Sequence, residues 1–110
     1  MPHEIRVTTA VATVLAVFLE DPAADRYGLD LMRATDQPSG TLYPILSRLL
    51  DAGWVVANWE SEHDPVVEGR PARRYYRLTP HGVTAARAAV ADLSQRLARA
   101  SMRQPKPRTA

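Results

Sequence analysis

Residues 40–50 read Gly-Thr-Leu-Tyr-Pro-Ile-Leu-Ser-Arg-Leu-Leu. The apolar residues of this stretch recur at the spacing that places side chains on one face of a helix. They are Leu42, Ile45, Leu46 and Leu49. Ser39 or Thr41 can cap the start of such a helix, and Pro44 is expected in its opening turn, where the missing N–H costs little. The stretch therefore predicts an amphipathic helix with one buried face.

The preceding sequence predicts two further helices. Apolar residues at helical spacing indicate a first helix over residues 7–19 and a second over residues 26–34, with Asp25 able to cap the second. Residues 35–38 are polar and predict a turn of about four residues before the third helix. Two helices joined by so short a turn are typical of a helix-turn-helix.

The following sequence predicts a β-ribbon. Gly53 fits the left-handed position that ends a helix. Residues 54–59 and 73–78 are rich in β-branched or aromatic residues, and their alternation places Tyr76 and Leu78 on one face. A polar connection lies between these two strands, so they form one long hairpin.

The last predicted helix begins with a cap at Thr79 and proline at position 80, and it runs to about Met102. Its apolar residues are spaced alternately by three and four, which is the a/d seam of a coiled coil. They are Val83, Ala86, Val90, Leu93, Leu97 and Ala100. The seam predicts a two-fold dimer built from this helix and the first one; the alternative is that the seam only covers the core of one copy.

These elements predict a mainly α fold with a two-stranded β-wing, which is a winged helix-turn-helix followed by a dimerisation helix. We expect residues 1–80 to form a DNA-binding domain, residues 81–102 the dimerisation helix and residues 103–110 a basic flexible tail. In this arrangement the helix after the turn enters the major groove of DNA, and the wing lies along the backbone or the minor groove.

The face of the third helix opposite its apolar residues is polar. We expect its DNA-contacting residues to be Ser39, Gly40, Thr41, Tyr43, Pro44, Ser47 and Arg48. Hydroxyl groups, an arginine and an aromatic ring near a helix N-terminus can bind phosphate oxygens and base edges. An ordinary solvated helix face is the alternative.

The formal net charge of +2 is unevenly distributed. Residues 1–69 hold four basic and eleven acidic side chains, a net of −7, whereas residues 70–110 hold ten basic and one acidic, a net of +9. Such asymmetry favours an extended anionic partner. The expected phosphate contacts of the wing are Arg70, Arg73, Arg74 and Arg77. Some of these arginines could instead pair with acidic side chains of the same hairpin.

Composition argues against several other classes of protein. The chain has no cysteine, which excludes thiol catalysis and thiolate metal sites. Only Glu62-His63-Asp64 groups metal-ligating residue types, and adjacent side chains converge poorly on one ion. We therefore expect no enzyme, no cofactor and no metal. No apolar run approaches the roughly 20 residues that cross a bilayer, and no signal peptide is recognisable, so we expect a cytoplasmic protein.

Three motifs resemble the PadR family of bacterial transcriptional regulators. They are Tyr-Gly at residues 27–28, Gly-Thr-Leu-Tyr-Pro at residues 40–44 and Gly-Arg-Pro-Ala-Arg-Arg-Tyr-Tyr-Arg-Leu-Thr at residues 69–79. The resemblance covers about residues 7–95. It implies a homodimeric winged-helix repressor of the family's compact subgroup with a single C-terminal helix, which binds a palindromic operator in double-stranded DNA.

Some members of that family release DNA when they bind phenolic acids or flat hydrophobic drugs, in some compact members between aromatic residues of the last helix. The last helix of this chain contains no aromatic residue. We therefore expect any small aromatic effector to bind near Phe18, Trp54 and Trp59. The alternative function is a winged-helix module that docks its basic half on an acidic protein partner.

Overall fold

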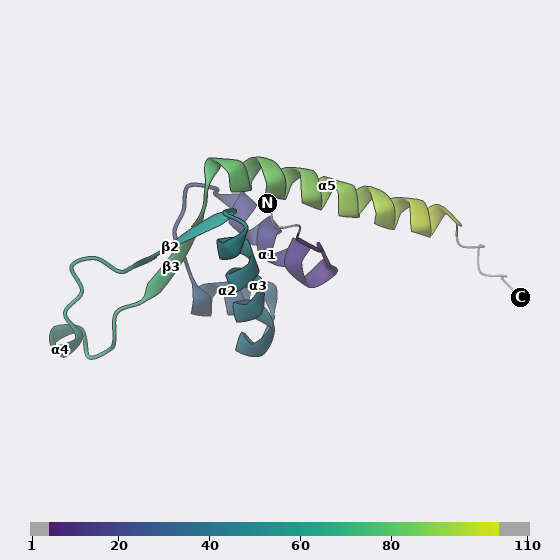
Figure 1. Ribbon diagram of the computed structural model, residues 1–110. Helices are drawn as coiled ribbons and strands as arrows, with labels where there is room; N and C mark the ends of the chain where they lie inside the picture. The colour runs from purple at the N-terminus through teal and green to yellow at the C-terminus, as the bar shows by residue number, and fades with distance from the viewer. Residues whose placement is uncertain (1–4, 104–110) are drawn as a thin grey trace, which may run out of the picture.

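The computed structural model describes residues 5–103 as a helical body from which a β-hairpin and a helix project (Figure 1). The elements are α1 (Thr9–Glu20), β1 (Arg26–Tyr27), α2 (Gly28–Thr35), α3 (Ser39–Asp51), β2 (Val55–Trp59), α4 (Pro65–Glu68), β3 (Arg74–Leu78) and α5 (Pro80–Arg103). We call residues 55–78 the wing. The predicted mainly α, winged-helix fold is confirmed. Arg103 ends α5, and the rest of the predicted tail lies outside the described residues.

The sheet has three strands rather than the two predicted, in the order β1-β3-β2. Arg26 and Tyr27 form the extra strand, pairing antiparallel with Tyr76 and Tyr75 of β3. The second helix therefore starts at Gly28, because a residue in an extended ladder cannot also be helical. The expected cap at Asp25 was wrong: Tyr27 occupies the N-cap position without a side-chain bond. The carboxylate of Asp25 instead lies 3.5 Å from Nη1 of Arg77.

The third helix begins slightly earlier than the sequence indicated. Its N-cap is Pro38, and no side chain caps it, so the predicted caps at Ser39 and Thr41 were wrong. The carbonyl of Pro38 accepts from the N–H of Thr41 at 3.0 Å. Pro44 consequently lies in the second turn and not in the first. The predicted left-handed conformation of Gly53 is confirmed by its φ of 74°.

The core joins α1, α2, α3, the sheet and the first half of α5. It consists of Val11, Val14, Leu15, Val17, Phe18, Leu31, Leu42, Ile45, Leu46, Leu49, Val55, Tyr76, Leu78 and Ala86. All four apolar residues predicted for the inner face of α3 belong to it. This packing turns the polar face of α3 outward.

The junction between β3 and α5 is tightly bonded. Thr79 caps α5 as predicted, because its Oγ1 accepts from the N–H of Gly82 at 2.9 Å. The same hydroxyl donates to the carbonyl of Gly53 at 2.7 Å, and the N–H of Thr79 donates to the carbonyl of Trp54 at 3.0 Å. The start of α5 is thus held against the turn that follows α3.

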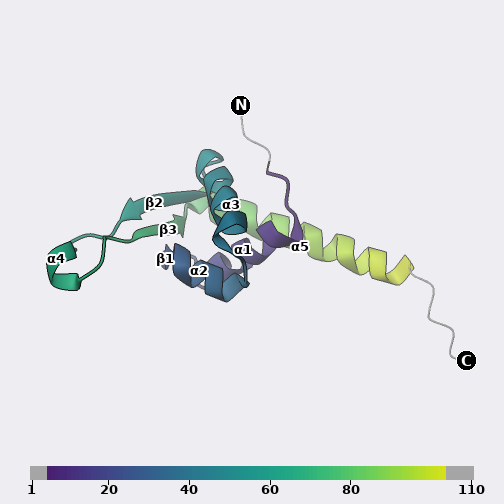
Figure 2. The ribbon, with the colours of Figure 1, turned by 90° about the horizontal axis from the view of Figure 1, so that it is seen from below.

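The molecule is elongated. Its radius of gyration is 17.3 Å, whereas a compact domain of this length would have about 13 Å. The difference arises because the wing and α5 leave the body on opposite sides (Figures 1 and 2). Within residues 5–103, no helix has both the length and the apolar character needed to cross a membrane.

Candidate nucleic-acid interface

The outer face of α3 carries all seven residues predicted to contact DNA. Each of them is exposed: Ser39, Gly40, Thr41, Tyr43, Pro44, Ser47 and Arg48. With 3.6 residues per turn, Gly40, Pro44 and Ser47 lie directly opposite the buried stripe. Tyr43 lies on one flank, next to the sheet. The centre of the surface is uncharged, with Ser47 as its hydroxyl group, and the surface carries no acidic side chain until Asp51, at the end of the helix.

A cavity of about 500 Å³ lies beside that flank. Its lining comes from three separate parts of the chain: the junction of β1 and α2, the start of α3, and the segment that leads into β3. The side chains that define its chemistry are Tyr27, Tyr43, Tyr76, Arg73 and Arg74. Burial raises the pKa of Tyr76, so this phenol is neutral at physiological pH. The cavity therefore combines aromatic walls with two positive charges.

Tyr43 reaches this cavity because residue 28 is glycine. A Cβ atom built on Gly28 would overlap the hydroxyl oxygen of Tyr43 and would lie 3.0 Å from its Cζ atom. Only glycine leaves room for the phenol at the start of α2. The Tyr43 ring is thus directed toward α2 along the cavity wall, although the residue belongs to the exposed part of α3.

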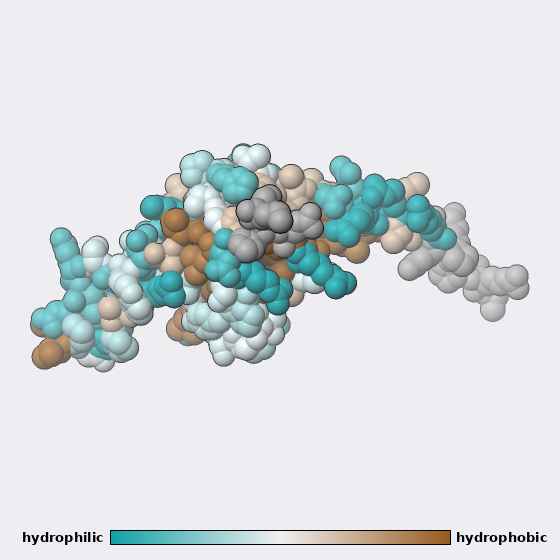
Figure 3. Space-filling view, viewed as in Figure 1, coloured by the Kyte–Doolittle hydropathy of each residue, from teal (hydrophilic) through white to brown (hydrophobic). Residues whose placement is uncertain are grey.

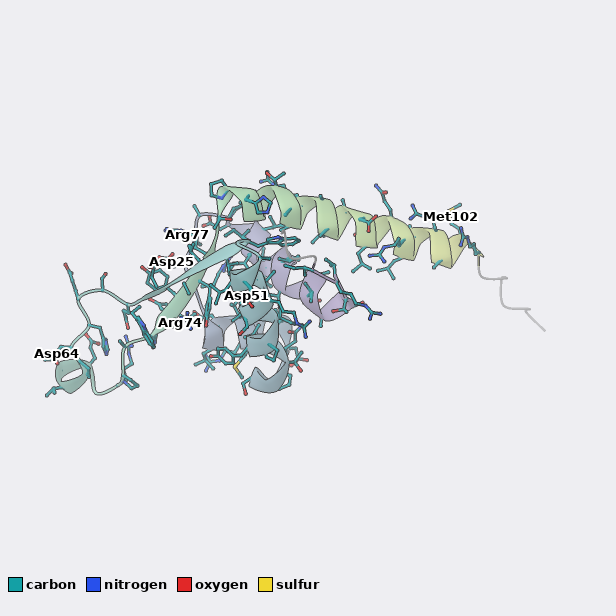
Figure 4. All side chains as sticks on the ribbon, viewed as in Figure 1. Asp25, Asp51, Asp64, Arg74, Arg77 and Met102 are labelled. Carbon is teal, nitrogen blue, oxygen red and sulfur yellow. The ribbon has the colours of Figure 1, made fainter. Side chains whose placement is uncertain are left out.

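The four wing arginines fall into two groups. Arg70 is held by Glu60, with Nη1 at 2.9 Å from Oε2 and Nη2 at 3.0 Å from Oε1. The hydrogen bond from Arg70 lowers the pKa of Glu60 to about 2, so this carboxylate stays charged. Arg77 pairs with Asp25 (Figure 4). The alternative that some wing arginines pair with acidic side chains of the same hairpin is therefore correct for Arg70. Arg77 also has an acidic partner, but that partner lies outside the hairpin.

The second group is Arg73 and Arg74. Within residues 5–103 neither guanidinium lies within ion-pair distance of a carboxylate. The guanidinium of Arg73 lies 5.2 Å from the ring centroid of Tyr27, and that of Arg74 lies 5.6 Å from the ring centroid of Tyr76. A cation–π contact with a ring uses none of the N–H donors of a guanidinium as a hydrogen bond. These two arginines are available to an anion.

The wing tip has a different chemistry. The polar connection between the two long strands contains α4, which was not predicted from the sequence. Its cap is Asp64, whose Oδ1 accepts from the N–H of Val66 at 2.9 Å. His63 is almost fully buried, and its Nε2 lies 2.7 Å from the carbonyl oxygen of Arg70. His63 is therefore part of the wing's internal packing. Among the described residues no group of three metal-ligating side chains occurs.

Acidic and apolar side chains cover the outside of this tip. Val66 and Val67 are 90% and 79% exposed, and hydrophobic atoms are visible there among hydrophilic ones (Figure 3). Glu62, Asp64 and Glu68 are exposed around them. A negatively charged tip is repelled by phosphate, so the wing surface suited to nucleic acid is limited to the base of the hairpin, near Arg73 and Arg74.

The apolar seam of α5 has two halves. Val83 and Val90 are partly buried and Ala86 is fully buried, because this half packs against α1 and the core. Leu93 is only partly buried, and Leu97 is 56% exposed. The first half of the seam therefore covers the core of one copy, which is the alternative stated for the whole seam. The second half does not pack on that core; its apolar residues are Leu93, Leu97 and Ala100.

The three residues expected to hold an effector do not share a site. Phe18 is 1% exposed and fills the core, whereas Trp59 is 65% exposed at the outer end of β2. Trp54 lies before the start of the same strand and packs against the core. Since successive strand residues advance by about 3.3 Å, the two indoles are too far apart to line one small pocket.

Comparison with known proteins identifies the family. The model of the "Transcriptional regulator PadR-like family" matches residues 14–88, from α1 to the first half of α5. The chain belongs to the PadR-like family of transcriptional regulators. The resemblance noted in the sequence is thus confirmed, and the match covers the helix-turn-helix, the wing and the cavity. No curated protein matches the chain.

Solved structures share the fold of this PadR-like chain. The crystal structure of smu.1704 from Streptococcus mutans UA159 has 24% identity and a TM-score of 0.68, with 100% of both chains covered. A PadR-like transcription factor from Bacteroides fragilis has 21% identity and a TM-score of 0.62, covering 86% of this chain and 88% of that one. Sequence identities this low establish only that these proteins share a fold with this chain.

A third structure contains DNA. It is reduced AbfR bound to DNA, AbfR being a protein of Staphylococcus epidermidis. It has 24% identity and a TM-score of 0.59 to this PadR-like chain, covering 78% of this chain and 58% of that one. The match therefore spans little more than half of the AbfR chain.

Sequence reasoning missed the cavity of this PadR-like chain and the ion pair that braces its wing. The cavity joins residues 27–28, residue 43 and residues 71–76, which no local pattern connects. One signal was present in the sequence: a glycine at the start of a helix often marks a place where another part of the chain approaches the backbone closely. The Glu60–Arg70 pair was anticipated only as one of several pairings within the hairpin.

Proposed function

We propose that this chain is a sequence-specific DNA-binding repressor that acts as a homodimer on a palindromic operator. The observation that carries the proposal is the outward polar face of α3 beside two arginines that lack acidic partners among the described residues. In this proposal α3 enters the major groove and Arg73 and Arg74 contact the backbone. Such a regulator acts on DNA in the cytoplasm.

The second half of α5 supports the dimer. The helix has 24 residues, and its end extends well beyond the body (Figure 1). A solvent-surrounded helix of about three turns is marginally stable by itself. Pairing with the same helix of a second copy would bury Leu93 and Leu97 and would match the two-fold symmetry of a palindrome.

The proposal favours DNA over the alternative of an acidic protein partner. Family membership supports this choice, and so does the geometry: the free arginines adjoin the exposed face of α3 instead of forming a separate basic patch. The proposal includes no effector, because Phe18, Trp54 and Trp59 do not line a common cavity.

Ser47 tests the role of α3. Its hydroxyl lies at the centre of the outer face, where a base edge would be read. We expect Ser47→Ala to weaken binding to the operator by about 1–3 kcal/mol and to leave binding to random DNA unchanged, because base contacts carry discrimination. Fluorescence anisotropy with both DNAs at one salt concentration measures the two affinities.

Ser94→Ala is the matched control. Ser94 is also an exposed helical serine, but it lies on α5. This variant should bind both DNAs like the unmodified protein. If Ser47→Ala weakens both DNAs equally, or neither, α3 does not read the sequence.

A further inference from the structure

We propose that the cavity beside Tyr43 binds a phosphate group of the DNA backbone and so sets the orientation of α3. The inference rests on the proposed function and adds a defined anion site to it. The site consists of Tyr43, Arg73 and Arg74, with Tyr27 and Tyr76 behind the two arginines. It assigns Tyr43 to the backbone and leaves the reading of bases to the centre of α3.

The difference among the wing arginines is the first argument. Arg70 is engaged by both oxygens of Glu60, and Arg77 lies 3.5 Å from Asp25. Arg73 and Arg74 line the cavity instead, and each makes a cation–π contact with a tyrosine. A cation–π contact engages the guanidinium charge without accepting a hydrogen bond, so the N–H donors remain available. Two guanidinium groups at one cavity match the charge and the hydrogen-bond geometry of a phosphate.

The position of Tyr43 is the second argument. Its phenol is turned toward Gly28 at the cavity wall, and among the described residues its hydroxyl has no hydrogen-bond partner within the protein. A phenol oxygen carries one proton to donate, and a phosphate oxygen in the cavity would accept it. A ring that points toward α2 is poorly placed to reach a base in the groove below α3.

The place of the cavity identifies the source of the phosphate. It adjoins the flank of α3, and the backbone of a duplex whose major groove holds a helix runs along that helix's flank. Farther out, the exposed Glu62, Asp64 and Glu68 repel the backbone. The phosphate would therefore be held where the wing joins the body, between the groove-facing surface of α3 and the acidic tip of the wing.

A backbone scan combined with a protein variant tests this inference. In a series of operator duplexes, one phosphate at a time is replaced by an uncharged methylphosphonate. For the unmodified protein we expect one or two adjacent positions in each half-site at which the replacement weakens binding about tenfold or more. With Arg74→Ala the same replacements should weaken binding clearly less, because only Tyr43 and Arg73 remain to contact the phosphate, and the dependence of log K on log salt should become about 0.9 units shallower.

Two other variants make the test specific. Gly28→Ala displaces the Tyr43 phenol without removing a charge, and it should lose affinity for operator and random DNA alike. Arg87→Ala removes an exposed arginine of α5 and should leave the methylphosphonate profile unchanged. Thermal unfolding of each variant shows whether the fold is retained.

The outcomes separate the two proposals. If the unmodified protein binds no DNA, the proposed function fails. If it binds DNA but Arg74→Ala shows the same methylphosphonate profile, the phosphate site is wrong and the proposed function stands. If no methylphosphonate position weakens binding, yet inorganic phosphate binds the unmodified protein and Arg74→Ala abolishes that binding, the cavity belongs to a free phosphate compound and the assignment to the backbone is overturned.

Discussion

Replacing Leu93 and Leu97 together by glutamate should convert the protein into a folded monomer. Leu93 is partly buried and Leu97 is 56% exposed, and both lie beyond the part of α5 that packs on the core. The monomer fold therefore tolerates the charges. In a dimer, however, four carboxylates would be buried along one seam without partners. Sedimentation equilibrium should give the mass of one chain.

Loss of the dimer should also remove operator binding. Two half-sites bound by one dimer gain affinity from linkage, commonly by a factor of 10² to 10⁴, so we expect operator affinity to fall at least about a hundredfold. The control is Ala91→Glu with Gln95→Glu, which adds the same charge on the opposite side of the same turns. A double Leu93/Leu97 variant that stays dimeric, with unchanged operator affinity, would show that the seam is not the interface.

Gly82→Ala should destabilise the fold strongly. A Cβ atom at this position would overlap the carbonyl oxygen of Trp54 and lie 2.7 Å from its carbonyl carbon. Both are backbone atoms, so no side chain can rotate out of the way. Helix α5 cannot move outward either, because Thr79 bonds to Gly53 and Trp54. We expect a loss of about 3 kcal/mol in the free energy of unfolding, measured by urea denaturation.

Gly40→Ala provides the comparison. Gly40 is also a helical glycine, but a Cβ atom there meets nothing within 4 Å. This variant should be equally stable or gain up to about 1 kcal/mol, because alanine favours the helix over glycine. Equal stability of the two variants would mean that α5 is not seated on Trp54.

The winged-helix order could be predicted because each main element has a local signal. The spacing of Leu42, Ile45, Leu46 and Leu49 depends only on helix geometry, and the Thr79-Pro80 start of α5 depends only on the unpaired groups of a first turn. Strand β1 has no such signal. Two residues are too few to show alternation, and Arg26 and Tyr27 are extended because they pair with a strand far along the chain.

The candidate site was predictable in its residue types but not in their partners. The exposed residues of α3 follow from the buried ones by periodicity. Periodicity does not show that Arg70 and Arg77 have carboxylate partners whereas Arg73 and Arg74 have none among the described residues. That difference depends on which carboxylates the folded chain brings within reach of each arginine. The direction of Tyr43 depends likewise on Gly28, which belongs to another helix.

Selection of DNA by the purified protein tests the central claim most directly. A pool of random duplexes is passed over the protein at physiological salt, and the retained fragments are sequenced. The account predicts a palindrome whose half-sites lie about one helical turn, 10–10.5 base pairs, or a multiple of it apart. Retention of all fragments without enrichment of any sequence, or retention of none, would contradict it.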